Sequence, residues 1–383
     1  MKNMRIRGMW MMAVMAAACG AMTTSCIGRS IPKTAENESG VVERLDSLFE
    51  SRYAEGEEAP GGAVIIAEGD SVIYERYFGL ADMETREPID ERTRFCIASV
   101  SKQMTVVGLL QQNVDMQDAV SEWIDFENPM WREITLQHLA SHTSGVPDSR
   151  DRSDREKCIH ADDEWSASYF PTVTDTKFVP GTAYDYLNPS FLLLAKVIEK
   201  NSGMAFADWQ QEHVFKPAGM EDTYYFDPSE HREHTAHGYE PTPEGWKEFD
   251  YGEETFFATR PDGGVYSTAR DMLKWEQALA HNVLLTPEQL EMAYRPVVEV
   301  SGSPWCDYQN RPNTYYALGW FVDRTPGQGE KVYHTGDNGG FQAYVAKYPS
   351  SGLKIIVLEN RHDKDRWEMA KAIDEIIGRE GTM

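Results

Sequence analysis

The stretch Phe95-Cys96-Ile97-Ala98-Ser99-Val100-Ser101-Lys102 places a serine three positions before a lysine, directly after a short apolar run. A second apolar run, Thr105-Val106-Val107-Gly108-Leu109-Leu110, predicts a buried helix that begins at Ser99. Because positions i and i+3 share a helix face, the Lys102 amine can contact the Ser99 hydroxyl and influence or accept its proton. The positive end of the helix dipole also favours an alkoxide here. We therefore predict that Ser99 is a nucleophile activated by Lys102.

The same serine-lysine spacing occurs twice more, at Ser30-Lys33 and at Ser351-Lys354. The first pair lies in a segment with little apolar content, which is typical of a tether. The second pair lies where a turn runs into a predicted strand, so its two side chains cannot share a helix face. Context therefore favours Ser99 and Lys102 as the functional pair.

Two further sequence words carry groups that an activated serine needs. Tyr186-Leu187-Asn188 offers a phenol, whose pKa a nearby lysine can lower so that it serves as a base, and an amide that can donate to a substrate carbonyl. The same spacing recurs at Tyr308-Gln309-Asn310, so spacing alone does not single out Tyr186. His334-Thr335-Gly336 occurs once and precedes Asp337-Asn338-Gly339-Gly340, whose glycines would let a substrate backbone approach closely.

The composition indicates a globular protein and argues against polyanionic partners. Of the 383 residues 41% are hydrophobic, which is enough for a core in one large domain or two closely packed ones. The 62 acidic and 37 basic residues give a net charge of −25, which disfavours nucleic acid as a partner. Beyond the N-terminal segment three cysteines remain, and an odd number argues against a disulfide framework, although one bridge could form: Cys96, Cys158 and Cys306. Cys96, in its apolar setting, is predicted to be a small buried hydrophobe.

Residues 1–25 are predicted to be an export signal peptide. An apolar run from Met9 to Met22, short for a membrane-spanning helix, follows the basic residues Lys2, Arg5 and Arg7. Cys26 follows small residues and is similar to the lipidated cysteine of a bacterial lipoprotein; Cys19 and a plain secretory signal are the alternatives. Residues 26–40 would then be a tether. All versions predict an exported protein, periplasmic or held to a membrane by an N-terminal lipid anchor.

Periodicity over residues 41–383 predicts an α+β domain. A first helix from Val41 is followed by a hairpin, a long stretch of helical patterns and polar loops, late strands and a last helix from about Lys364 with Asp363 as its cap. The predicted strands span residues 63–67, 72–74, 316–322, 344–348 and 353–358. This order predicts a mostly antiparallel sheet flanked by N- and C-terminal helices, formed by residues 41–92 and 281–383, with a helical subdomain over residues 93–280. We expect the active site where the subdomain meets the sheet.

A possible metal pair is disfavoured by its sequence context. His138 and His142 lie four positions apart on a predicted helix. The glutamate that follows the first histidine of a zinc-hydrolase helix is absent, because Leu139 stands there. We therefore predict a structural role for both histidines, and neither a metal nor a cofactor.

The chain resembles the serine hydrolase family of class C β-lactamases, D-alanyl-D-alanine carboxypeptidases and related esterases and D-amino-acid peptidases. The resemblance covers residues 41–380 and rests on six stretches in the same order: Phe95–Lys102, Leu139–Gly145, Pro180–Asn188, Pro217–Met220, Gly263–Asp271 and Leu318–Trp320. It implies a β-lactamase/penicillin-binding-protein-like fold and a reaction that needs no metal.

The resemblance also implies a role for the reacting groups. Ser99 would be acylated, Lys102 would activate it, and Tyr186 would shuttle protons. The backbone N–H groups of Ser99 and Asp337 would form the oxyanion hole, where losing one donor typically costs about 3 to 4 kcal/mol of barrier.

Four more residues are implied to hold the substrate. Asn188 would orient its amide or ester, and Thr335 and Gly336 would bind it. His334 would stand where β-lactamases usually have a lysine and would support Tyr186 and a bound carbonyl or carboxylate. Because an imidazole holds a carboxylate less firmly than an ammonium does, this histidine favours a peptidase or esterase over a dedicated β-lactamase.

The predicted function is that of an exported serine hydrolase that forms an acyl-enzyme on Ser99 and cleaves an amide or ester, such as a D-amino-acid-containing cell-wall peptide. A carboxylesterase and a weak β-lactamase of the same family are alternatives. A non-catalytic peptide-binding lipoprotein is a third, although a binding protein has no need of the nucleophile and its base. The expected partners are small-molecule or peptide substrates.

Overall fold

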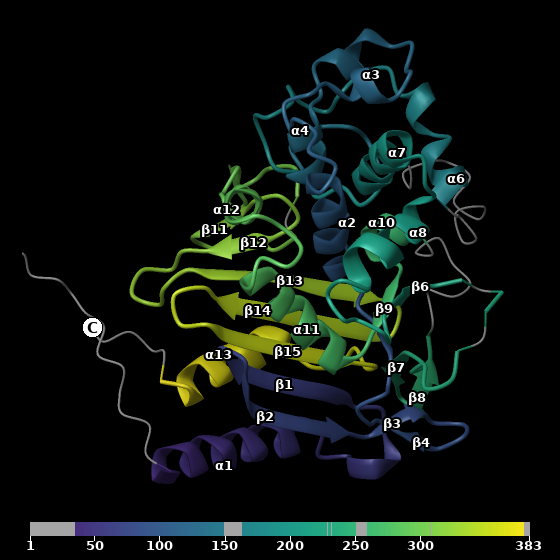
Figure 1. Cartoon of the computed structure of the whole chain (residues 1–383). Helices are drawn as coiled ribbons and strands as arrows, with labels where there is room; N and C mark the ends of the chain where they lie inside the picture. Colours follow the sequence, from purple (N-terminus) through teal and green to yellow (C-terminus); the bar gives the residue numbers. More distant parts are fainter. Residues whose placement is uncertain are drawn as a thin grey trace, which may run out of the picture.

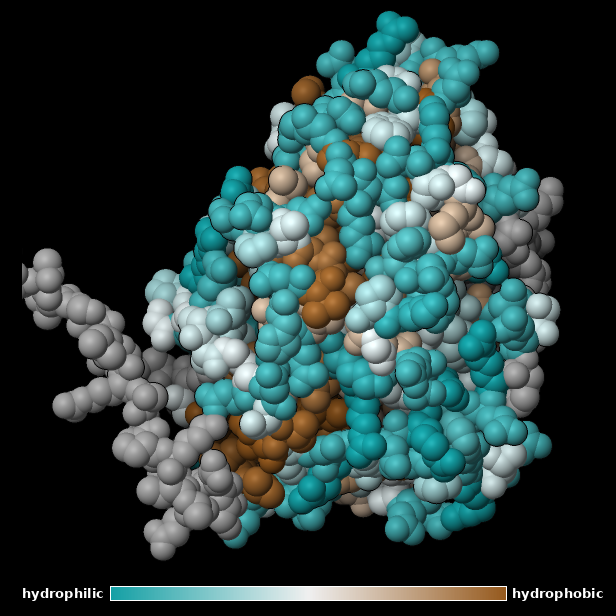
Figure 2. All heavy atoms as spheres, in the orientation of Figure 1, coloured by the Kyte–Doolittle hydropathy of each residue, from teal (hydrophilic) through white to brown (hydrophobic). Residues whose placement is uncertain are grey.

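The computed structural model describes residues 35–148, 163–227, 229–230, 232–249, 259–306 and 308–378. The predicted signal peptide, Cys19, Cys26, the Ser30-Lys33 pair and Cys158 lie outside these residues. Within them, no helix is both long and apolar enough to cross a membrane. The face shown in Figure 2 is covered largely by hydrophilic residues, with smaller apolar areas between them.

One eight-stranded antiparallel sheet forms the lower part of the molecule as seen in Figure 1. Its order is β10-β11-β12-β13-β14-β15-β1-β2, so the N-terminal hairpin joins the C-terminal strands through β1 and β15. The strands are β1 (Gly62–Glu68), β2 (Ser71–Phe78), β10 (Val298–Glu299), β11 (Thr314–Tyr316), β12 (Phe321–Asp323), β13 (Lys331–Asn338), β14 (Phe341–Tyr348) and β15 (Leu353–Glu359). The predicted hairpin and antiparallel sheet are confirmed.

Helices cover both faces of this sheet. Strand β1 is a nearly continuous apolar run buried along most of its length, which is the pattern of a strand with layers on both sides. Val64 and Ile66 pack on one face with α1 (Ala35–Arg52) and α13 (Arg366–Ile376). The intervening residue Ile65 packs on the opposite face with α11 (Ala269–Ala280), which crosses the front of the sheet in Figure 1. Fully burying one such side chain stabilises the fold by about 1.5 to 3 kcal/mol.

The helical part lies above the sheet in Figure 1 and surrounds α2 (Ser101–Leu110). Every residue of α2 is buried, as expected of a helix that is covered on all sides. Helix α7 (Ser190–Ser202) packs against α2 and ends at Gly203, whose φ of 72° is a left-handed conformation that glycine adopts without strain. The other helices are α3 (Val120–Trp123), α4 (Leu136–Ala140), α6 (Asp163–Ala167), α8 (Phe206–Gln210), α10 (Arg260–Gly263) and α12 (Pro287–Tyr294).

Short strands accompany the helices, and periodicity did not predict them. Three form a small sheet in the order β5 (Phe95–Cys96), β9 (Val265–Ser267) and β6 (Tyr224–Tyr225). Strands of two or three residues are too short to show an alternating pattern. Two further pairs join β3 (Leu80–Asp82) to β4 (Glu87–Pro88) and β7 (Tyr239–Thr242) to β8 (Gly245–Glu248).

Three predicted boundaries need correction. Helix α1 begins at Ala35, inside the segment predicted to be a tether. The predicted strand 316–322 is two strands, β11 and β12, because the chain turns between them at Gly319, whose φ is 80°. Helix α13 begins at Arg366 and is capped by Asp365, whose carboxylate accepts from the first backbone N–H groups of the helix. Asp363 is not the cap, because it pairs with Arg361 instead.

Candidate active site

Ser99 lies in the 3-10 turn Ala98–Val100, between β5 and α2. Pairing of β5 with β9 holds the chain on one side of the turn, and the buried helix α2 holds it on the other. Ala98 has a φ of 46°, a left-handed conformation that a non-glycine residue adopts only where its surroundings impose it. Helix α2 begins at Ser101, so the prediction that the buried helix begins at Ser99 is wrong by two residues. Ser99 lies in the turn just before the helix and is only partly buried.

Lys102 is fully buried, and its amine contacts two oxygens. Its Nζ lies 3.1 Å from Ser99 Oγ and donates to the Asp262 carbonyl at 2.7 Å. It also lies 5.1 Å from the centroid of the Tyr186 ring. Helix α10 therefore fixes the amine against the serine through Asp262, a role that the sequence did not indicate. The only part of the sequence analysis close to Asp262 was the family-like stretch Gly263–Asp271, which begins at the next residue.

Tyr186 reaches the same point from the segment before α7. Its ring centroid lies 4.1 Å from that of His142 and 4.6 Å from that of Tyr308. Burial raises the pKa of Tyr186 well above 10, neighbouring tyrosines raise it further, and a contact with the Ser99 side chain opposes the shift. The expectation that Lys102 lowers this pKa is therefore wrong, because the cost of burying a phenolate outweighs the attraction of the amine. Tyr186 carries its proton at neutral pH.

His142 supports Tyr186 from behind. The Leu187 backbone N–H donates to His142 Nδ1 at 3.0 Å, and burial lowers the pKa of His142 well below 6.5, so its ring is neutral. The predicted helical pairing with His138 is wrong, because α4 ends at Ala140 and His142 has a φ of 58°. His138 instead accepts from the Thr135 backbone N–H at 3.2 Å, so both histidines hold local structure, as predicted.

His334 comes from β13 with both ring nitrogens engaged. Its Nδ1 donates to the Thr335 carbonyl at 2.7 Å, and its Nε2 accepts from the Tyr316 hydroxyl at 3.1 Å. Burial, reinforced by the charge of Lys102, lowers the pKa of His334 to about 3, so the imidazole is neutral. The His334 and Tyr186 rings lie 6.3 Å apart. In this arrangement neither nitrogen of His334 is open to a substrate.

This buried histidine should make stability depend on pH. Its folded-state pKa of about 3 lies below the value of about 6.5 in an unfolded chain, so the unfolded state binds the proton more readily and stability falls as the pH drops below 6.5. Between pH 7.5 and pH 5.0 we expect His334 to account for a loss of about 2 kcal/mol in the free energy of unfolding. Urea unfolding of wild type and His334→Gln at both pH values measures the difference. His281→Gln, at an exposed histidine, is the control and should retain the wild-type loss. An equal loss in all three proteins would rule out this role of His334.

Strand β13 passes close beside the turn that carries Ser99. A Cβ at Gly336 would lie 2.2 Å from the Ile97 carbonyl oxygen, so only glycine permits this approach. Asp337 follows in the strand, and Arg366 of α13 reaches it. Arg366 Nη1 donates to the Gly336 carbonyl at 3.2 Å, and its Nη2 donates to the Asp337 carboxylate. The structure thus brings the segments of both predicted oxyanion-hole donors together.

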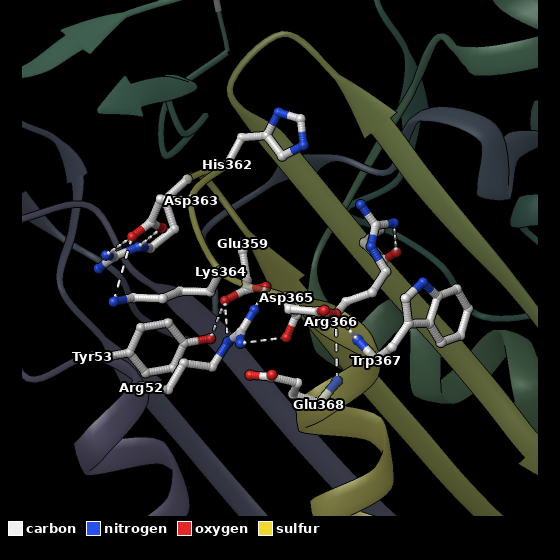
Figure 3. A network of polar contacts seen from close by, with 12 residues as sticks. Arg52, Tyr53, Glu359, His362, Asp363, Lys364, Asp365, Arg366, Trp367 and Glu368 are labelled. Carbon is white, nitrogen blue, oxygen red and sulfur yellow. Dashed lines mark hydrogen bonds and ion pairs between the residues drawn. The ribbon is translucent and has the colours of Figure 1, made fainter. Parts of the chain in front are cut away.

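A polar network lies around the start of α13 (Figure 3). Asp365 caps the helix. Arg52 at the end of α1 donates to both oxygens of Glu359, each at 2.8 Å, and the Tyr53 hydroxyl donates to Glu359 at 2.8 Å. Arg52 Nη1 also donates to the Asp365 carbonyl at 3.1 Å, so the end of α1 is joined both to the end of β15 and to the start of α13.

The remaining predicted residues are Asn188, in the segment that also carries Tyr186, and Thr335, on β13. Asn188 precedes α7, and its Oδ1 is buried without a hydrogen-bond partner among the described residues. Thr335 is fully buried, and its hydroxyl contacts Tyr308 and Gln309. The second Tyr-x-Asn word, which spacing could not separate from the first, therefore lies at the same site.

Comparison with known proteins identifies the family of this chain. Residues 45–377 match the family model described as Beta-lactamase. The chain belongs to the beta-lactamase family. This beta-lactamase-family protein is therefore a serine hydrolase that acts through an acyl-serine, in a family that acts on small-molecule or peptide substrates.

Three curated relatives illustrate the family. Penicillin-binding protein 4* of Bacillus subtilis is 28% identical over 361 residues, which are 87% of this chain and 75% of the relative. The D-alanyl-D-alanine-carboxypeptidase/endopeptidase AmpH of Escherichia coli K12 is 26% identical, over 94% of each chain. A D-aminopeptidase of Cereibacter sphaeroides is 27% identical over 84% of this chain, which spans 60% of that relative.

Solved structures confirm the predicted fold. A penicillin-binding protein from Bacillus halodurans superimposes with a TM-score of 0.72 at 26% identity, over 87% of this chain and 98% of that one. A penicillin-binding protein homologue from Pyrococcus abyssi gives a TM-score of 0.75 at 23% identity, over 88% of this chain and 77% of that one, and shows the fold alone.

Proposed function

We propose that the protein is an exported hydrolase that forms an acyl-enzyme on Ser99 and cleaves an amide or ester of a D-amino-acid-containing cell-wall peptide. The observation that carries the proposal is the contact of 3.1 Å between Lys102 Nζ and Ser99 Oγ, with the amine held by the Asp262 carbonyl. This is the arrangement of a nucleophile with an adjacent activating group.

The protons would move between three side chains. The Lys102 amine, in its neutral form, accepts the Ser99 proton as Ser99 attacks the substrate carbonyl, and it returns this proton to Ser99 Oγ when the acyl group is released. Tyr186, which carries its proton, donates to the leaving group and then helps to activate the water that releases the acyl group. The backbone N–H groups of Ser99 and Asp337 stabilise the developing oxyanion.

The other predicted residues would position the substrate and the strand. Asn188, whose buried side-chain oxygen has no hydrogen-bond partner within the described part of the chain, orients the substrate amide. Gly336 lets β13 approach the serine, and Thr335 lies next to it on the strand. His334 is neutral, and its hydrogen bond to Tyr316 fixes β13 relative to β11 without an ion pair.

The names of two relatives support a peptide substrate, because one is a D-aminopeptidase and another a D-alanyl-D-alanine-carboxypeptidase/endopeptidase. A carboxylesterase and a weak β-lactamase would use the same acylation chemistry. A non-catalytic binding protein is disfavoured, because it would not need the buried amine on the serine. Export rests on residues 1–25, and lipidation at Cys26 would anchor the protein to a membrane.

Labelling tests the acyl-serine centre directly. We expect a fluorophosphonate to add one adduct per chain, located on Ser99 by peptide mapping. A panel of nitrophenyl esters, acyl-D-Ala-D-Ala peptides, D-amino-acid amides and nitrocefin would then name the substrate class. A folded protein that remains unlabelled would refute the proposal.

A further inference from the structure

The segment between β10 and β11 covers Thr335 with two side chains. The Tyr308 hydroxyl lies 2.9 Å from Thr335 Oγ1, and Gln309 Nε2 donates to the same oxygen at 3.0 Å. Thr335 has no exposed surface. The hydroxyl that the resemblance assigns to substrate binding is therefore already bonded within the protein and closed to solvent.

This covering segment is attached to the site at several points. The Tyr308 ring lies 4.6 Å from the Tyr186 ring and 6.2 Å from the Phe321 ring, centroid to centroid. Ser303 donates to the Tyr184 carbonyl, and the Trp305 ring packs 5.4 Å from that of Phe178. The covering segment therefore contacts both the segment that carries Tyr186 and the sheet, and it forms one side of the site.

A substrate carboxylate would compete poorly for Thr335. A hydroxyl has one proton and two lone pairs, and here Gln309 already occupies one lone pair while Tyr308 shares a further bond. A carboxylate can only accept the Thr335 proton, so it would replace the contact with Tyr308, and because Thr335 has no exposed surface it could do so only if the covering Tyr308 and Gln309 side chains moved aside. Leaving a buried polar group unpaired is costly, so the closed arrangement disfavours such a substrate.

The charges around the site act in the same direction. His334, in the place of a family lysine, is neutral. Lys102 is engaged by Ser99 and Asp262, and Arg366 is bonded to Asp337. The Asp337 carboxylate is itself one-third exposed. A free carboxylate would therefore meet a neutral imidazole at His334 and the like charge of Asp337, and the Arg366 cation is already paired with Asp337.

We infer that Tyr308 and Gln309 are specificity-determining residues that close the Thr335 side of the site and select substrates with no free carboxylate beside the scissile bond. Amides, esters and internal peptide bonds of D-amino acids fit this description, whereas a peptide cut next to its terminal carboxylate does not. This inference rests on the proposed function and names its substrate class.

A matched pair of thioesters tests the inference. N-benzoyl-D-alanyl-mercaptoacetate carries a carboxylate one carbon from the leaving sulfur, and the corresponding mercaptoacetamide carries a neutral amide at the same place. For wild type we expect kcat/KM to be at least about tenfold higher for the neutral compound. In the double variant Tyr308→Phe/Gln309→Ala, which keeps the ring against Tyr186 but frees Thr335, the ratio should fall to about threefold or less.

The control is Ser301→Ala, which removes a hydrogen bond to Glu299 on the same segment and should keep the wild-type ratio. A wild-type ratio near one, or a ratio unchanged in the double variant, overturns the inference while the proposed function stands. Absence of both turnover and a Ser99 adduct overturns the proposed function. A labelled protein that turns over neither thioester overturns the D-amino-acid substrate class and the inference with it.

Discussion

Replacing Lys102 with Met should lower kcat/KM by at least about 10⁴-fold, because the serine loses the group that activates it. The amine is fully buried, contacts Ser99 Oγ at 3.1 Å and is held at 2.7 Å by the Asp262 carbonyl. Met retains most of the side-chain length beside the Tyr186 ring, so the fold should tolerate the change. Hydrolysis of a reactive ester, together with the rate of fluorophosphonate labelling, measures the effect.

Ser351-Lys354, which has the same spacing as Ser99-Lys102 but lies outside the site, provides a matched control. Lys354 of Ser351-Lys354 is also buried, but its amine donates to the Gly69 carbonyl at 2.7 Å on the far side of a turn. We expect Lys354→Met to keep activity within about threefold of wild type, since it touches no reacting group. Ser99→Ala should be unlabelled and as inactive as Lys102→Met, because the two residues act as one unit. More than about a tenth of wild-type activity in Lys102→Met would show that another group activates the serine.

Much of the fold could be predicted because its elements are long and strongly patterned. The apolar run of β1, the largely apolar strand β15 and the buried run of α2 can be recognised from the sequence pattern alone. The β5-β9-β6 sheet was not, because two- or three-residue strands show no period and exist only through their partners. The turn at Gly319 was not predicted either, because it lies inside an apolar stretch and tertiary contacts decide where a buried strand bends.

The site was predictable where chemistry follows from local geometry. The spacing of Ser99 and Lys102 fixes their contact across one turn of chain, and this contact is present. The Asp262 carbonyl that holds Lys102 lies 160 residues after it in the sequence. Because it is a backbone group, which every residue type has, the sequence could not predict its role. The raised pKa of Tyr186 depends on burial and on Tyr308, neither of which spacing reveals.

Charge at the site differs most from the expectation. The resemblance implied that His334 would support a bound carbonyl or carboxylate, yet both of its nitrogens are bonded within the protein and its pKa is about 3. The second Tyr-x-Asn motif, Tyr308-Gln309-Asn310, which spacing could not distinguish from the first, supplies Tyr308, and this residue covers Thr335. The two observations together shift the substrate preference away from free carboxylates, and neither is visible until the chain is folded.

Replacing Gly336 with Ala should lower kcat by about 10² to 10³-fold, by moving one side of the oxyanion hole. The new Cβ would lie 2.2 Å from the Ile97 carbonyl oxygen and 3.2 Å from the Ala343 side chain, so β13 must move away from the turn that carries Ser99. Both obstacles belong to rigid elements, the backbone before the 3-10 turn and the paired strand β14, so no flexible side chain can give way. A displacement of about 1 Å between the two donors is enough for a loss of this size.

The kinetic signature separates this effect from general damage to the fold. Because the oxyanion hole acts on the transition state, kcat and kcat/KM should fall together while KM changes little. Gly263→Ala is the control, since Gly263 lies beside the same turn but its added Cβ would be 3.9 Å from the nearest atom, the Ala98 carbonyl carbon. Near-UV circular dichroism and the urea midpoint should show that both variants fold. If Gly336→Ala folds and keeps the wild-type kcat, Asp337 does not supply an oxyanion-hole donor, because the strand that carries it cannot stay in place around a Cβ at this position.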